Sequence, residues 1–278
     1  IDISNDLLIS NSLILLGSNL VNHQDFELCK VLTNIISTLT KSKKGFLNGS
    51  CNEAGARIAG CLPNKSAGFL DVKNIGLNAS DSINEGMECY MIYNLDLIDF
   101  YHYSELKKSL SNAKFVLGFQ SFVTEEDKNY YDVILPLATV FESPGTFINI
   151  EGQWQSFAQG CKPHFMSKEG WKILTKLRAE FGKNISDSLD YIDILNEADS
   201  VIRDSKFFEN NEYSDFKEDS FSSAAPLIRC GGSSSYYIDN IVRRAPSLNK
   251  VSPNNNSVSV NKKTLEQNNI DLSKNKVI

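Results

Sequence analysis

Short apolar runs alternate with amphipathic stretches over the first two thirds of the chain, and this alternation constrains the fold most. Residues 12–17 form a strand-length apolar run that ends at a glycine, as in a strand buried on both faces. Residues 25–40 follow with apolar side chains at helical spacing. Strand, turn and helix in this order open a βαβ unit. We therefore expect an α/β fold in which a mainly parallel, doubly wound sheet carries helices on both faces.

The same periodicities predict the remaining elements. Strands are expected at 45–47, 88–93, 114–119, 132–135 and 145–150. Helices are expected at 52–59, 103–112, 167–181 (with Ser167 as the cap) and 188–202. Residues 41–44 are interpreted as a basic linker, and 65–86 and 120–130 as loops.

Charge changes along the chain and suggests three regions. Residues 1–182 form the α/β domain, and 183–246 form an acidic helical region with a C-terminal signature. Residues 183–219 contain eleven acidic and four basic side chains, which gives this segment a net charge of −7. Residues 247–278 are a basic tail rich in Asn and Ser, which has little to bury and is expected to be extended.

Bulk properties exclude several classes of protein. The formal net charge of −6 argues against nucleic-acid binding, which needs a basic surface. No apolar run reaches the ~18 residues that span a bilayer, so direct membrane insertion is not expected.

The first residue is Ile1, which suggests a processed end or part of a longer product. No two cysteines have Cys-x-x-Cys spacing, so no local metal or iron–sulfur site is expected, and six scattered cysteines in a chain of this length do not indicate a disulfide framework. The six are Cys29, Cys51, Cys61, Cys89, Cys161 and Cys230.

Isolated polar residues offer weak candidates for chemistry. Gly17-Ser18-Asn19 follows the first strand and resembles a phosphate cradle, but a simple turn is the better interpretation. Three histidines lack a partner at metal spacing and are interpreted as hydrogen-bonded loop residues: His23, His102 and His164. Three carboxylates after Thr124 suggest a solvated cluster at the start of a helical turn rather than an acid–base pair: Glu125, Glu126 and Asp127.

Residues 132–155, DVILPLATVFESPGTFINIEGQWQ, form the most specific stretch. A buried strand ends at Pro136, a loop carries Glu142, and Asn149, Glu151 and Gly152 form a polar turn. Polar groups after a strand's carboxyl end are where open α/β sheets bind ligands. The alternative is a structural turn whose polar groups bind one another.

This stretch resembles the molybdopterin-oxidoreductase family, in which Ala-Asp-Val-Ile-Leu-Pro is followed by a glutamate and by Asn-x-Glu-Gly-Arg. Here Gln153 stands where the family has the arginine. Within the family, the likeness is greatest to the largest peripheral-arm subunit of respiratory complex I. Residues 170–174 resemble its Trp-Lys-Ile helix, 188–202 its acidic helix, and 236–247 its C-terminal signature.

The resemblance implies a non-catalytic, structural part of the peripheral matrix arm of NADH:ubiquinone oxidoreductase, on the mitochondrial inner membrane. Its partners would be other peripheral-arm subunits, above all the chain that carries the N-terminal iron–sulfur segment. Gln153 removes a bidentate cation suited to phosphate or pterin, so we assign no catalytic, cofactor-binding or metal residue. One alternative is a fragment or subunit of a molybdopterin-dependent oxidoreductase. Another is a generic α/β ligand-binding module.

Overall fold

The computed structural model describes residues 8, 11–17, 20, 25–47, 49–100, 102–182, 190–202, 235–250 and 260–268. The sequence predictions for Ser18, Asn19, His23 and Cys230 lie outside these residues. Contacts divide the chain into two units, 1–216 and 217–278, each of which is described by itself.

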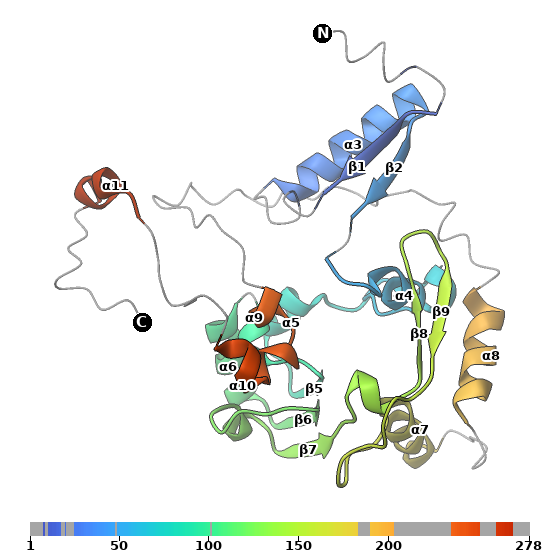
Figure 1. The fold of residues 1–278 in the computed structure, drawn as a ribbon, viewed down its shortest axis with the longest axis vertical. Helices are drawn as coiled ribbons and strands as arrows, with labels where there is room; N and C mark the ends of the chain where they lie inside the picture. The colour runs from blue at the N-terminus through green and yellow to red at the C-terminus, as the bar shows by residue number, and fades with distance from the viewer. Residues whose placement is uncertain are drawn as a thin grey trace. The chain divides into compact units, whose positions relative to one another are not determined.

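A βαβ unit opens the described chain, as the sequence predicted. Strand β1 (Leu13–Leu16) leads into helix α3 (Phe26–Thr40) and strand β2 (Lys43–Phe46), which pairs with β1 in parallel. The helix lies along the two strands (Figure 1). The rings of Phe26 and Phe46 meet edge to face, with 6.4 Å between their centroids. Because Phe46 is in register with Leu16, α3 covers the face of β1 that carries Ile14 and Leu16.

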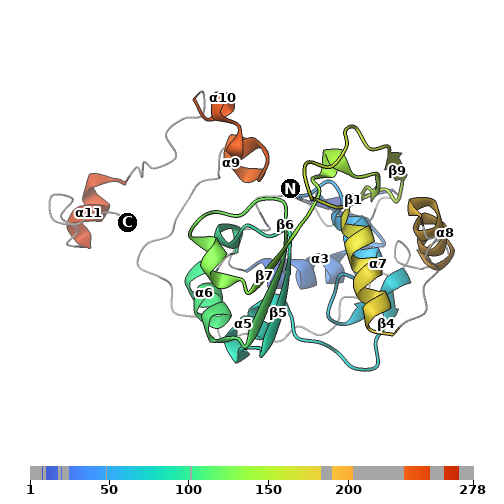
Figure 2. The same ribbon diagram turned by 90° about the horizontal axis from the view of Figure 1, so that it is seen from below.

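Among the described residues, the main sheet consists of three parallel strands. Its order is β5 (Cys89–Tyr93), β6 (Phe115–Gln120) and β7 (Val133–Pro136). Helices α5 (Ala79–Glu85) and α6 (Tyr103–Asn112) lie on one side of this sheet, and α7 (Gly170–Glu180) lies on the other (Figure 2).

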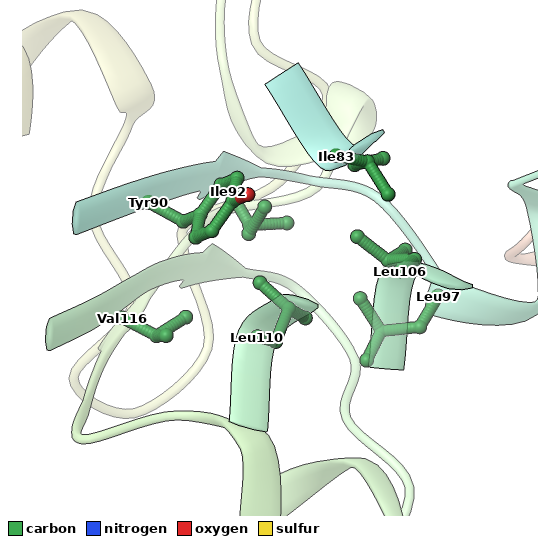
Figure 3. Close-up of a cluster of buried hydrophobic side chains, with 7 residues drawn as sticks. All are labelled: Ile83, Tyr90, Ile92, Leu97, Leu106, Leu110 and Val116. Atoms are coloured by element: carbon green, nitrogen blue, oxygen red, sulfur yellow. The ribbon is translucent and has the colours of Figure 1, made fainter. Parts of the chain in front are cut away.

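The core under α5 and α6 is built from one face of β5 and β6. Tyr90 and Ile92 point from β5 towards the helices, together with Val116 from β6 (Figure 3). The remaining members are Ile83, Leu97, Leu106 and Leu110. The Tyr90 hydroxyl stays hydrogen-bonded within this core, through Ser109 Oγ at 2.6 Å and the Ser82 carbonyl at 2.9 Å. Its burial therefore leaves no unpaired hydroxyl.

A second, smaller core joins three segments that are far apart in the sequence. Ile58 of helix α4 (Glu53–Ile58), Ile148 of strand β8 (Gly145–Ile148) and Ile202 of helix α8 (Tyr191–Ile202) are all buried together. Trp154 packs against them from strand β9 (Trp154–Phe157), which forms an antiparallel hairpin with β8. A short hairpin, β3 (Lys65–Ser66) with β4 (Leu70–Asp71), flanks the turn η1 (Ala67–Phe69).

The remaining elements are short. Turns η2 (Leu97–Asp99), η3 (Asp127–Tyr130) and η4 (Val140–Glu142) connect the strands of the first unit. The second unit contains α9 (Ser235–Ile238), η5 (Val242–Arg244), α10 (Pro246–Asn249) and α11 (Lys262–Gln267). The described residues include no helix that is both long enough and apolar enough to cross a bilayer.

The α/β class and the parallel main sheet are confirmed, but several local predictions were wrong. Residues 41–44 are not a linker, because β2 begins at Lys43 to pair with β1. Within 65–86, expected to be a loop, lies α5, capped where Asn78 accepts the N–H of Asp81. Helix α7 follows Glu169 rather than Ser167, whose hydroxyl donates to the His164 carbonyl. Strand β1 is not buried on both faces, since Leu13 and Leu15 are exposed.

Candidate functional site

The family-like stretch runs from the end of β7 through η4 into the β8–β9 hairpin. Pro136 is the last residue of β7, and the chain leaves the sheet there. Leu137 and Ala138 are buried, and the N–H of Ala138 donates to the Lys168 carbonyl at 2.8 Å. The polar residues of the motif are thus carried on a segment that is anchored at its start.

Glu142 organises the loop after β7 through both carboxylate oxygens. Its Oε2 accepts the N–H and the hydroxyl of Thr139, at 2.8 and 2.9 Å, in a capping box. Its Oε1 accepts the N–H of His164 at 2.9 Å. The N–H of Thr139 lowers the pKa of Glu142 below its usual value, and the other two donors lower it further against an opposing effect of burial. The carboxylate therefore ties together two loops that are more than twenty residues apart.

Asn149 closes the turn between β8 and β9. Its side-chain oxygen accepts the N–H of Glu151 at 3.0 Å and that of Gln153 at 2.9 Å. The N–H of Gly152 donates to the Asn149 carbonyl at 3.0 Å, and Gly152 has a φ of 78°, which favours glycine. The side chains of Glu151 and Gln153 are exposed. The side chain of Asn149 therefore holds this turn together. The sequence had left open this alternative, a structural turn whose polar groups bind one another.

Gly145 starts the hairpin because no side chain fits there. A Cβ at this position would lie 2.3 Å from Cζ of Phe157, the residue paired with it across the hairpin. Phe157 packs edge to face on Phe147, with centroids 5.0 Å apart. The hydroxyl of Thr146, the residue between Gly145 and Phe147, shares hydrogen bonds with the Ser156 hydroxyl at 2.9 Å and with the Tyr191 hydroxyl at 2.6 Å. The hairpin is thus fixed to α8.

Asn52 is a residue that sequence reasoning missed. Its side-chain oxygen accepts the N–H of Ile148, 96 positions away, at 2.9 Å. Gly55 makes this possible, because a Cβ there would lie 2.1 Å from that same oxygen. The signal present in the sequence was an asparagine three residues before a glycine at a helix start, which by itself predicts only a cap.

The acidic cluster after Thr124 is a surface turn, as interpreted from the sequence. Glu126 forms an ion pair with Lys107, and Glu125 one with Lys128 at 2.7 Å. Thr124 Oγ1 accepts the N–H of Asp127 at 3.0 Å, at the start of η3. The one departure is that Asp127 is buried, with its Oδ1 lacking a hydrogen-bond partner.

The other candidates are not brought together. His102 precedes α6, and His164 is exposed beside Phe165. Gly17 has open space where a Cβ would lie. The described cysteines are free thiols, one of them half-buried and the rest exposed: Cys29, Cys51, Cys61, Cys89 and Cys161. Among the described residues, no group of three or more His, Cys, Asp or Glu side chains is arranged to hold a metal ion.

A buried polar contact marks the carboxyl end of β6. Gln120 Nε2 donates to the Tyr131 hydroxyl at 2.9 Å and to the Leu95 carbonyl at 3.2 Å. Burial raises the pKa of Tyr131 to about 12, while the hydrogen bond from Gln120 opposes that rise. Tyr131 is therefore a neutral phenol near pH 7 and fixes the end of the strand.

Fold and motif together define a domain of the molybdopterin oxidoreductase class. The sequence profile of that family, described as molybdopterin oxidoreductase, matches residues 3–180. Since this range covers well over half of the chain, the chain belongs to that family.

Individual relatives come from two kinds of enzyme. The alpha subunit of a formate dehydrogenase from Methanocaldococcus jannaschii is 28% identical over 178 residues, covering 56% of this chain and 26% of the relative. The mitochondrial NADH-ubiquinone oxidoreductase 78 kDa subunit of Candida albicans is 23% identical over 165 residues, covering 59% and 21%. A subunit of the NADH-quinone oxidoreductase of Streptomyces coelicolor is 29% identical over 82 residues, covering 30% and 10%. The chain thus spans about a quarter or less of these relatives.

Proposed function

We propose that this chain is a non-catalytic, structural part of the peripheral arm of a complex I-type NADH:ubiquinone oxidoreductase. The observation that carries the proposal is that the polar groups of the motif bind one another. The carboxylate of Glu142 accepts the main-chain N–H groups of Thr139 and of His164 in the following loop, and the side-chain oxygen of Asn149 accepts those of Glu151 and Gln153. Such groups stabilise a loop and are not available to a ligand.

The residues of this loop do not fit a pterin dinucleotide. A phosphate-bearing ligand is best held by a fixed guanidinium fork, and Gln153 at the family's arginine position is uncharged and exposed. The turn around it is already closed by Asn149. A domain that keeps the turn without the cation serves as a scaffold, so no reaction step is assigned to its residues.

The proposal places the chain beside the polypeptide that carries the iron–sulfur segment, on the matrix side of the mitochondrial inner membrane. Similarity to a mitochondrial subunit and to a bacterial subunit of NADH oxidoreductases supports membership of a complex I-type assembly, on which this placement rests. The second candidate is a fragment of a molybdopterin-dependent oxidoreductase, which the formate dehydrogenase relative favours.

Metal and pterin analysis separates the two candidates. The full chain, carrying an affinity tag, is isolated with its partners from the cells that express it. Our proposal predicts polypeptides of an NADH oxidoreductase in the eluate and less than a tenth of a molybdenum atom per chain. Near-stoichiometric molybdenum and pterin, with no such polypeptides, establishes the second candidate.

A further inference from the structure

The loop that follows β9, residues 158–168, presents large apolar side chains to solvent. Phe165 is 91% exposed and Met166 is 80% exposed. Turn η4, which lies beside this loop, adds Val140 and Phe141, both of them exposed. Single exposed apolar side chains are common on protein surfaces, whereas several on adjoining segments mark an interaction site. We call these four residues the Phe165 platform.

Main-chain hydrogen bonds fix the two segments of the platform to each other. The Phe141 carbonyl accepts the N–H of Gly160 at 3.0 Å and that of Cys161 at 3.2 Å. The carboxylate of Glu142 accepts the N–H of His164, the residue before Phe165, at 2.9 Å. The platform is therefore preorganised, and a preorganised surface loses little conformational entropy when a partner binds.

The backbone of Phe165 is held in a conformation that costs free energy. Its φ is 47°, in the left-handed region that residues other than glycine rarely adopt. The N–H and the hydroxyl of Ser167 both donate to the His164 carbonyl, at 3.0 and 2.6 Å, and hold the loop on either side of Phe165. Because the Phe165 ring stays exposed, its burial within the described part of the chain does not offset this cost. Strain of this kind is typical of residues that bind a partner.

The polar surroundings of the platform are basic. Residues 158–168 contain Lys162 and Lys168 and no Asp or Glu. Both lysines are exposed, and neither forms an ion pair with another residue that the structure describes. Two nearby carboxylates are occupied, since Glu142 accepts main-chain N–H groups and the buried Glu169 pairs with Lys172 at 2.7 Å. This surface is therefore locally basic on a chain whose net charge is −6.

We propose that the Phe165 platform docks into an apolar pocket, rimmed by Asp and Glu side chains, on a neighbouring polypeptide. Aromatic side chains and Met are enriched in protein interfaces, and charged groups lie at the rim. In this arrangement Phe165 is the anchor, and Lys162 and Lys168 face the acidic rim. The inference rests on the proposed function, under which the neighbour is a subunit of an NADH oxidoreductase.

The small number of basic side chains favours a protein over a lipid surface as the partner. Recruitment to anionic lipids takes clusters of about four to eight Lys or Arg residues, and the loop has two. A backbone that fixes one ring at a defined position also suits a pocket of defined shape, whereas insertion among lipid chains needs no such definition.

Site-specific photocross-linking tests the proposal on the full chain in the cells that express it. A photoreactive phenylalanine analogue replaces Phe165 in one affinity-tagged version and Phe181 in a second. Phe181 is 76% exposed at the end of α7, outside the platform, and is the matched control. From position 165 we expect a cross-linked partner peptide with more Asp and Glu than Lys and Arg. Position 181 is expected to give at least fivefold less of it.

Charge reversal tests the rim. In the version with the analogue at position 165, Lys162→Glu is expected to lower the cross-linking yield at least threefold, because it places a negative charge against the acidic rim. Lys176→Glu, at an exposed position of α7, is the matched control and is expected to leave the yield unchanged. Thermal melting of both variants, which is expected to match the parent chain, shows that the fold is kept.

The outcomes separate this proposal from the proposed function. Docking is overturned if position 165 cross-links to no polypeptide, whether or not subunits of an NADH oxidoreductase co-purify; their presence in the eluate supports the proposed function independently. Cross-linking to lipid, to a second copy of the chain or to a peptide without an acidic excess also overturns docking, as does a yield that Lys162→Glu leaves unchanged. An acidic, Lys162-dependent cross-link in an eluate without those subunits supports docking and refutes the proposed function.

Discussion

The hydrogen bond between Ile148 and Asn52 can be tested by mutation, because it depends on the space that Gly55 leaves for the Asn52 side chain. The N–H of Ile148 is buried and donates to the Asn52 side chain at 2.9 Å. Asn52→Ala leaves this N–H unpaired, which costs about 1–3 kcal/mol. For a unit of about 200 residues this lowers the melting temperature by roughly 2–12 °C. Asn74→Ala, at an exposed position, serves as the control and is expected to change stability by less than about 0.5 kcal/mol.

Gly55→Ala extends the test to a double-mutant cycle. In the parent chain the new Cβ would lie 2.1 Å from the Asn52 oxygen, and the three nearest atoms to it all belong to Asn52. The substitution therefore displaces that side chain and destabilises the fold by about 1–3 kcal/mol. In the Asn52→Ala background the clash is gone, and alanine gains about 0.5–1 kcal/mol over glycine within a helix.

Urea unfolding of the four proteins measures the cycle. We expect the effect of Gly55→Ala on the free energy of unfolding to change sign between the two backgrounds, with a coupling of at least about 1 kcal/mol. Additive effects of the two substitutions would mean that Gly55 does not make room for the Asn52 side chain.

Four further outcomes follow from the site and the family assignment. Gly145→Ala should destabilise the fold by about 1–3 kcal/mol, because the Cβ would meet Phe157, whereas Gly17→Ala should be tolerated; thermal melting compares them. Glu142→Gln should lose about 1–2 kcal/mol at pH 7. Folding lowers the pKa of Glu142, so the stability that its carboxylate contributes is fully present above about pH 4.3. The stability difference between the variant and the parent chain therefore shrinks as the pH falls through the pKa of Glu142 in the folded chain. Urea unfolding at pH 7 and at pH 3 measures this difference. Asn149→Ala should lower stability by about 0.5–1.5 kcal/mol and speed amide exchange in the hairpin turn. Restoring the family's cation by Gln153→Arg should not produce a chain that retains molybdenum, and stoichiometric retention would show that the cation alone was missing.

Local patterns in the sequence were sufficient for the elements that contact mostly their neighbours. Apolar spacing and adjacent turn residues predicted the helix at 103–112, which was confirmed, and a strand at 114–119, which the structure places at Phe115–Gln120. Helix α5 was missed because its segment is polar, with Ile83 as its buried residue, so that its cap at Asn78 was the main signal. Strand β9 was missed for a similar reason, since pairing with β8 rather than its own composition makes it a strand.

The site depended on distant contacts that no local pattern contains. The sequence placed Glu142 and Asn149 in a polar stretch after a buried strand, where a ligand could bind. Their hydrogen-bond partners in the structure show that both side chains stabilise loops. The Asn52–Ile148 bond spans 96 positions and follows only from the packing of α4 against β8. Apolar composition also predicted burial of β1, although burial of a strand depends on which neighbours cover it.

Native electrophoresis shows whether this chain is part of an NADH oxidoreductase. Membranes from the cells that express the chain are solubilised and resolved under native conditions, and the chain is quantified by mass spectrometry across the lane. We expect the chain to peak with the band that oxidises NADH, in a one-to-one ratio with the polypeptide that carries the iron–sulfur segment. If the chain peaks elsewhere, with molybdenum and no NADH-oxidising activity, it is not a structural part of an NADH oxidoreductase.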